Sequence, residues 1–194
     1  MATRLVKIPA ARGRLREAAE QIQLATGRRI EIIRGTLLMP PAPPVHHMAA
    51  LNDLRHLLDD RLPEGLGDFE NVAVPLPGDP DDYAVPSLLV CRTAVLAAEP
   101  QEWLLPGEDA ELAVEVTSPS ERPVGVADKI AWYAEARVPR LLYLFPAKGS
   151  WSLHSRPSDE GYRTVSYGKY GDAVPLPDEL GGELPTGDLP RYEA

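Results

Sequence analysis

The sequence predicts an α/β domain with a mixed central β-sheet flanked by helices. Segments with apolar residues at helical spacing alternate along the chain with short β-prone segments, which is typical of α/β proteins. The 194 residues suit one domain, and a domain of this size buries roughly 70% of the surface of its unfolded chain. Hydrophobic residues make up 44% and charged residues 25%, and this globular composition excludes a largely disordered chain.

The N-terminal part predicts one helix followed by two strands. Residues 12–26 carry apolar side chains at helical spacing, and Gly27 is a suitable stop. Residues 29–39 are rich in isoleucine and leucine on both sides of Gly35, which favours two short strands joined by a turn.

The middle of the chain predicts a second helix and several strands. Four prolines within residues 40–44 exclude regular structure there, and residues 45–61 present leucines on one helical face. Residues 78–82 have the composition of a turn, and residues 121–136 predict a third helix. Strands are predicted over residues 68–76, 83–91, 112–117, 140–145, 151–155 and 162–167.

These elements predict three parts along the chain. Residues 1–27 form a basic N-terminal helix and arm, and residues 28–170 form the domain itself. Residues 171–194 are rich in proline and glycine and are expected to pack on the domain as a C-terminal tail.

Charge is distributed unevenly along the chain. The net charge is −9 and the pI about 4.9, which argues against a nonspecific phosphate-binding surface. Residues 1–34, however, hold eight Lys and Arg against three Glu, a net charge of +5 that leaves −14 for the rest. The basic arm could contact nucleic acid, but pairing with the acidic body is the favoured interpretation.

The single cysteine and the absence of long apolar runs indicate a cytoplasmic protein. Cys91 alone excludes an internal disulfide framework and a multi-cysteine zinc site. No apolar run approaches the ~18 residues of a membrane span, so we expect no membrane association. The N-terminus has no apolar signal core, so we expect no secretion signal.

Glu115 is the most informative residue of the sequence. It lies in the apolar segment Leu112–Val116, where strand alternation places Ala113 and Glu115 on one face and Val114 on the other. A carboxylate in a buried strand must be paired or metal-bound. A half-exposed sheet with Glu115 in water explains the pattern equally well.

Lys129 is the second candidate. Val126 and Tyr133 lie three and four residues away, a spacing that places the lysine on or beside the inward face of the third helix. An ammonium group there could reach the edge of the sheet. The favoured alternative is a buried stem with the charge in water.

Other candidate groups have weaker patterns. His46 and His47 could bind zinc together with His56 or His154, but nothing in their spacing favours such a site. Ser87 lacks the surrounding glycines of a nucleophile elbow, and the chain contains no phosphate-binding loop. The aspartates of residues 79–82 form an oxygen-rich segment, although such turns are usually only solvated.

Several of these residues belong to motifs of a known family. Val-Glu-Val-Thr-Ser-Pro-Ser surrounds Glu115, and Lys129-x-x-x-Tyr133 leads into Ala-Glu-Ala-Arg-Val-Pro. With Glu31-x-x-x-Gly35 and a Pro-Pro-Ala-Pro stretch upstream, residues 28–167 resemble the Uma-two family of restriction endonucleases, in the PD-(D/E)XK nuclease superfold.

The resemblance implies a restriction-endonuclease-like fold, with a mixed central sheet flanked by helices, and metal-dependent hydrolysis of phosphodiester bonds. In the superfold an Asp and a Glu on adjacent strands hold Mg²⁺, and a Lys steadies the attacking water or the developing charge. Glu115 matches the strand Glu and Lys129 the helical Lys of the family, so these two are the expected catalytic residues. Glu31 matches an upstream acid, and Glu31 and Asp82 are the candidate metal ligands beside Glu115.

The sequence also departs from the family at several positions. The Pro-Asp dipeptide of the family falls on Pro86-Ser87, so Ser87 replaces a carboxylate and Mg²⁺ is expected to bind weakly. Thr117 stands where many superfold members carry their Lys, Gly125 replaces an acid before Lys129, and Arg137 replaces a glycine.

Three functions therefore remain open. The first is an endonuclease with a degenerate site. Its expected substrate is DNA, and a homodimer is one possible state. The second is an inactive nuclease fold that binds a protein or nucleic acid partner. The third is an unrelated small-molecule binder, whose mark would be an apolar pocket without convergent carboxylates.

Overall fold

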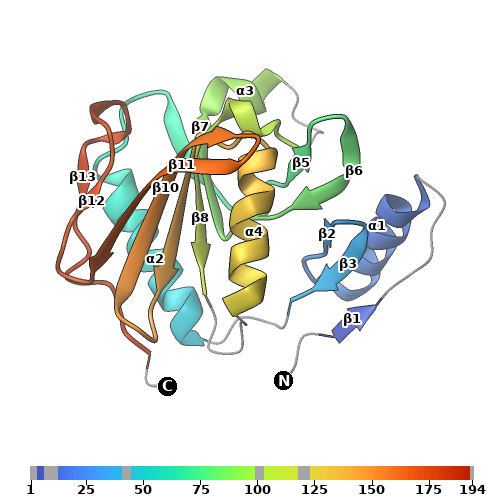
Figure 1. The fold of residues 1–194 in the computed structure, drawn as a ribbon, viewed down its shortest axis with the longest axis horizontal. Helices are drawn as coiled ribbons and strands as arrows, with labels where there is room; N and C mark the ends of the chain where they lie inside the picture. The colour runs from blue at the N-terminus through green and yellow to red at the C-terminus, as the bar shows by residue number, and fades with distance from the viewer. Residues whose placement is uncertain (1–3, 7–12, 41–44, 99–102, 118–122, 193–194) are drawn as a thin grey trace.

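Two β-sheets form the framework of the protein in the computed structural model, which describes residues 4–6, 13–40, 45–98, 103–117 and 123–192 (Figure 1). The larger sheet contains, in spatial order, β11 (Gly161–Lys169), β10 (Ser150–Ser158), β9 (Arg140–Phe145), β8 (Ala110–Val116), β7 (Leu88–Arg92) and β4 (Leu66–Phe69). The smaller sheet contains β1 (Arg4–Val6), β3 (Thr36–Met39), β2 (Glu31–Ile33), β6 (Asp79–Ala84) and β5 (Val74–Leu76). The larger sheet is mixed, because β8 and β9 run parallel while the other pairs are antiparallel.

Helices cover both faces of the larger sheet. The helices are α1 (Arg14–Thr26), α2 (Val45–Asp59), α3 (Thr93–Ala98) and α4 (Pro123–Glu135), with short 3₁₀ turns at Gly107–Asp109 and Asp178–Leu180. α4 lies in front of the sheet in Figure 1 and α2 lies behind it. The predicted fold class, a mixed sheet flanked by helices, is confirmed.

The strand β8 divides the core into two clusters, because successive side chains point to opposite faces. Leu112, Val114 and Val116 pack with the leucines of α2. Ala113 packs on the other face with Trp132 and Tyr133 of α4. Glu115 shares the face of Ala113 and therefore points toward α4.

The smaller sheet carries the N-terminal helix and brings Glu31 next to the larger sheet. Leu15 and Ala19 of α1 are buried in a third cluster with Ile30 and Ile32. The helix predicted over residues 12–26 is present from Arg14, and residue 12 lies outside the described residues together with 1–3 and 7–11.

The prediction of a turn over residues 78–82 was wrong. β6 begins at Asp79, which pairs with Leu76 of β5, so the turn consists of Pro77 and Gly78 alone. Gly78 has a φ of 79°, a backbone conformation that glycine adopts without steric cost. The segment 68–76, predicted as one strand, contributes β4 to the larger sheet and β5 to the smaller one.

The C-terminal tail contributes to the core on the α2 side. β12 (Val174–Pro175) pairs with β13 (Glu183–Leu184). Leu176, Leu180, Leu184 and Leu189 are buried with Leu54 and Leu58 of α2. Within the described part of the chain, none of the helices has both the length and the apolar character needed to span a membrane.

Candidate functional site

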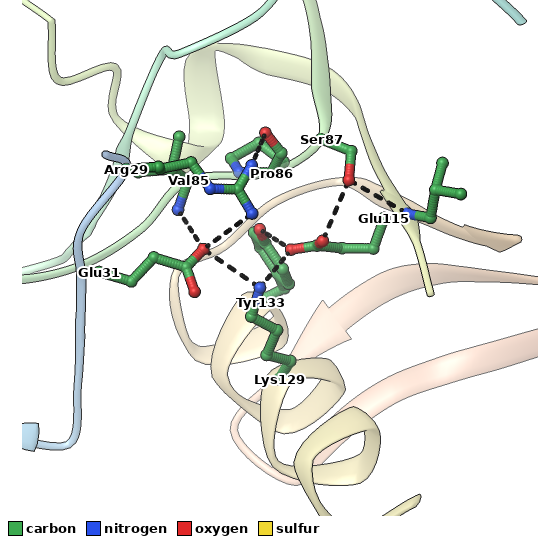
Figure 2. A network of polar contacts seen from close by, with 9 residues as sticks. Arg29, Glu31, Val85, Pro86, Ser87, Glu115, Lys129 and Tyr133 are labelled. Carbon is green, nitrogen blue, oxygen red and sulfur yellow. Dashed lines mark hydrogen bonds and ion pairs between the residues drawn. The ribbon is translucent and has the colours of Figure 1, made fainter. Parts of the chain in front are cut away.

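Two carboxylates and an amine meet between the two sheets and α4. Figure 2 shows Lys129 reaching from α4 toward both Glu31 and Glu115. Lys129 Nζ lies 2.8 Å from Glu115 Oε1 and 3.1 Å from Glu31 Oε1. All three groups are withdrawn from water, since the side chains of Glu31, Glu115 and Lys129 are 2%, 6% and 13% exposed.

Secondary structure explains why these side chains converge. Glu115 is the last but one residue of β8 and lies on the face covered by α4. Lys129 and Tyr133 are four residues apart on α4, so they lie one above the other on the same helical face. Both donate to the same atom, because Tyr133 Oη is 2.8 Å from Glu115 Oε1.

Within the described part of the chain, the second oxygen of Glu115, Oε2, makes a single long contact. Ser87 Oγ lies 3.5 Å from Glu115 Oε2, the long limit of a hydrogen bond. The same Ser87 hydroxyl accepts a hydrogen bond from the backbone N–H of Val116 at 3.2 Å. Ser87 therefore lies beside Glu115 on the neighbouring strand connection and faces the same way, as the alignment with the family's Asp requires.

Glu31 is held from the other side by a backbone donor and a guanidinium. The N–H of Val85 donates to Glu31 Oε1 at 3.0 Å. Arg29 Nη2 lies 3.6 Å from the same oxygen, and Arg29 Nη1 donates to the carbonyl of Pro86 at 3.3 Å. Arg29 thereby connects Glu31 to the Pro86–Ser87 segment (Figure 2).

The charges of this cluster balance. Two carboxylates, Glu31 and Glu115, face two cations, Lys129 and Arg29. Burial alone would raise the pKa of Glu31, but Lys129, Arg29 and the Val85 N–H outweigh burial and lower it. Burial alone would lower the pKa of Lys129, but Glu115 and Glu31 raise it above its ordinary value. Lys129 is consequently a protonated donor at neutral pH and not a general base.

The structure decides between the alternatives for two of the predicted residues. Glu115 is buried and paired, and the half-exposed interpretation was wrong. The favoured interpretation of Lys129, a buried stem with its charge in water, was wrong as well, because the ammonium itself is bound between carboxylates.

Asp82 makes its contacts away from the cluster. Its Oδ1 accepts a hydrogen bond from Trp132 Nε1 at 2.8 Å, and its Oδ2 accepts one from the backbone N–H of Gly35 at 2.9 Å. Both oxygens thus fasten the β2–β3 turn to α4, and the described contacts join neither of them to Glu31 or Glu115. These contacts do not support the expected role of Asp82 as a metal ligand.

We expect Asp82→Ala to lower the free energy of unfolding by about 1–3 kcal/mol, because Trp132 Nε1 would be buried without a partner. The affinity of the Asp82→Ala variant for Mg²⁺ and Mn²⁺ should equal that of the wild type. Urea denaturation and calorimetric titration measure the two quantities, with Asp81→Ala on the same strand as the control. A loss of metal affinity in Asp82→Ala, absent in the control, would restore Asp82 as a ligand.

The histidines do not assemble a metal site. Within the described ranges, no three His, Cys, Asp or Glu side chains are grouped so that they could hold a metal ion. His154 is instead paired with Ser152 inside the sheet, with Ser152 Oγ 3.0 Å from His154 Nε2. Thr117, at the position of the superfold Lys, donates its hydroxyl to the carbonyl of Leu144.

The sequence patterns did not identify two residues of the cluster, Tyr133 and Arg29. Tyr133 was used only to phase the third helix, although its spacing of four residues from Lys129 could have indicated a shared target. Arg29 was counted only as part of the basic arm. Its contact with Glu31, two residues further along the chain, could have been predicted only from strand alternation, which places the two residues on one face.

A family model and a solved structure match this chain. Residues 16–187 match the family Uma2, described as "Putative restriction endonuclease". A solved structure from Anabaena variabilis ATCC 29413, described as "a putative nuclease belonging to DUF820", superposes with a TM-score of 0.69 at 17% sequence identity. The match covers 84% of this chain and 90% of that chain, and at this identity it establishes the fold alone. No curated protein matches the chain.

Proposed function

Because the chain belongs to the Uma2 family, we propose that it is a metal-dependent endonuclease that hydrolyses phosphodiester bonds at a site lacking one carboxylate. The observation that carries the proposal is the convergence of Glu31, Glu115 and Lys129 from three separate elements. A buried charge cluster of this kind is costly to maintain, and perturbed ionisable groups are concentrated at functional sites.

The donor set fits a weakly held Mg²⁺ or Mn²⁺. Among the described residues, Glu115 Oε2 has only the long contact to Ser87, so it is the oxygen of Glu115 most available to a cation. Mg²⁺ is commonly bound through one or two carboxylates together with substrate phosphates. Glu115 and Glu31 would hold the ion, which when bound supplies Lewis-acid stabilisation of the phosphate and activation of water.

The remaining residues have distinct roles in this proposal. Lys129, held protonated by the two carboxylates, stabilises negative charge that develops on the phosphate. Tyr133 fixes the orientation of Glu115 by binding Oε1 and leaving Oε2 to the cation. Ser87 occupies the position of the family's Asp, and its neutral hydroxyl weakens the site.

We expect the wild type to cleave DNA slowly, because a misplaced or partly occupied metal can reduce the rate ~100-fold. Plasmid and single-stranded DNA are incubated with Mg²⁺ and with Mn²⁺, beside Glu115→Ala and Lys129→Ala. Both substitutions should abolish the cleavage. The matched control is Glu111→Ala, on the same strand but paired with Arg92 and Arg140 outside the cluster. Equal cleavage by the wild type and by both cluster variants would show that none of the cleavage depends on Glu115 or Lys129 and would contradict the proposal.

A binding module without catalysis is the second candidate, and the charge balance favours it. Lys129 and Arg29 already neutralise the two carboxylates, so a cation must compete with Lys129 for Glu115 and Glu31. Calorimetric titration of Mn²⁺ into the protein separates the two functions. No metal binding, together with DNA binding and no cleavage, would identify the binding module.

A further inference from the structure

Arg29 is the most exposed charged member of the cluster. Its side chain is 29% exposed, and none of the other charged side chains of the cluster exceeds the 13% of Lys129. Figure 2 shows that Arg29 reaches Glu31 from the side of the connection between β6 and β7, whereas Lys129 reaches it from α4. Of the ionised groups in the cluster, Arg29 is therefore the one that a ligand arriving from solvent meets first.

The contact of Arg29 with Glu31 is longer than that of Lys129. Arg29 Nη2 is 3.6 Å from Glu31 Oε1, and Arg29 Nη1 donates to the carbonyl of Pro86 at 3.3 Å. Lys129 Nζ lies 3.1 Å from the same oxygen of Glu31 and 2.8 Å from Glu115 Oε1. Because the attraction between two charges falls with distance, Arg29 separates from Glu31 at a lower cost than Lys129 does.

The charge balance of the cluster changes when a divalent cation binds the two carboxylates. Without metal, the carboxylates are balanced by Lys129 and Arg29. The added cation leaves the cluster with an excess of positive charge, and like charges at short range repel. Since Arg29 has the longer contact and the greater exposure, it is the group that this repulsion moves toward solvent.

A guanidinium is well suited to the substrate that arrives there. Its planar fork of N–H donors matches two oxygens of a phosphate group, and such charge-assisted hydrogen bonds are stronger than those between neutral groups. The ammonium of Lys129 acts as a compact point charge and cannot supply this two-pronged contact. The two cations of the cluster therefore have different uses toward a phosphodiester.

We propose that Arg29 exchanges its partner, pairing with Glu31 in the metal-free protein and binding the non-bridging oxygens of the phosphodiester once a metal is held by Glu31 and Glu115. This inference rests on the proposed function, because the metal and the phosphodiester belong to that same site. It makes Arg29 a substrate-binding residue with opposite effects on two ligands. Arg29 competes with the metal for Glu31, and it holds the substrate when the metal is bound.

Metal affinity tests the first half of the exchange. Arg29→Gln removes the competing charge, so it should bind Mn²⁺ about tenfold more tightly than the wild type in calorimetric titration. Arg28→Gln is the matched control, because Arg28 is the adjacent residue but donates to the carbonyl of Pro40. Arg28→Gln and the charge-preserving Arg29→Lys should both bind Mn²⁺ as the wild type does.

The affinity for a short DNA duplex tests the second half. With Ca²⁺ present, Arg29→Gln should weaken duplex binding about ten- to hundredfold, as expected for lost hydrogen bonds to a charged group. Without a divalent ion the same substitution should weaken binding much less, because Arg29 is then held by Glu31. Arg29→Lys should recover part of the affinity, since it keeps the charge and loses the fork. Arg28→Gln should have the same effect on binding with and without Ca²⁺.

The outcomes separate this inference from the proposed function. Unchanged Mn²⁺ affinity in Arg29→Gln, or equal weakening of its duplex binding with and without Ca²⁺, would overturn the exchange of partners. DNA cleavage that depends on Glu115 and Lys129 would in that case still support the proposed function. If neither the wild type nor Arg29→Gln binds Mn²⁺, both proposals are wrong.

Discussion

Lys129→Met should lower the free energy of unfolding by about 3–5 kcal/mol, since removing one partner leaves buried charges uncompensated. Glu31 and Glu115 would remain buried at 2% and 6% side-chain exposure, and Lys129 is the cation nearest to both. Arg29 would remain near Glu31, but at 3.6 Å it is the more distant of the two cations. Guanidinium denaturation at neutral pH measures the loss.

The loss of stability in Lys129→Met should depend on pH. In the wild type the pKa of Glu31 is lowered from 4.5, so its stabilisation is present above that pH and disappears as the pH falls through the folded-state pKa. In Lys129→Met, burial dominates and raises the pKa of the same carboxyl. The stabilities of the two proteins should therefore differ most near neutral pH. The difference should begin to narrow as the pH falls through the raised pKa of Glu31 in the variant, above 4.5, and should narrow further below 4.5 as the wild type loses its own stabilisation.

Two variants complete this experiment. Lys169→Met is the matched control, because Lys169 is exposed on the edge strand β11 and should cost less than about 0.5 kcal/mol. Adding Glu115→Gln to Lys129→Met should recover part of the stability by removing one unpaired charge. A loss in Lys129→Met no larger than that of Lys169→Met would show that the cluster contributes nothing to stability.

Ser87→Asp should create the second strand carboxylate that the family pattern contains. Ser87 is buried, with its hydroxyl 3.5 Å from Glu115 Oε2, so an Asp side chain would place its charge beside that oxygen. Two buried carboxylates this close repel each other. The metal-free variant should therefore be less stable than the wild type by about 0.5–3 kcal/mol, the usual range for a destabilising substitution.

Metal should reverse the destabilisation, because an ion that binds only the folded state stabilises it. We expect Ser87→Asp to bind Mn²⁺ and Mg²⁺ at least about tenfold more tightly than the wild type, equivalent to ~1.4 kcal/mol. The rate of DNA cleavage should rise by up to ~100-fold as the metal and the water are positioned. Calorimetric titration and thermal unfolding with and without Mn²⁺ measure these changes.

Ser87→Asn separates charge from shape in this experiment. Asn has nearly the volume of Asp but no charge, so it should lose the serine contacts without gaining metal affinity. Equal metal affinity of the Asp and Asn variants would mean that Ser87 does not occupy a ligand position. The alignment of Pro86-Ser87 with the family's Pro-Asp would then be wrong.

Local patterns in the sequence were sufficient for the fold class and for the direction of Glu115. The two-residue period of a strand placed Leu112 and Val114 opposite Ala113, and β8 has this arrangement. The four-residue spacing of Lys129 and Tyr133 placed them on one face of α4 in the same way. These features depend on residues close together in the chain, and the family motifs around Glu115 and Lys129 are local as well.

Tertiary structure decided everything that joins distant parts of the chain. Lys129 and Glu31 are 98 residues apart and Val85 and Glu31 are 54 apart, and no period in the sequence relates them. Asp82 was expected beside Glu115 because a carboxylate suits a metal. In the folded protein its two oxygens instead accept hydrogen bonds from Trp132 of α4 and from the backbone of Gly35. Burial and partner choice depend on which elements pack together, so the pairing of Glu115 with Lys129 became decidable only when β2, β8 and α4 were placed in space.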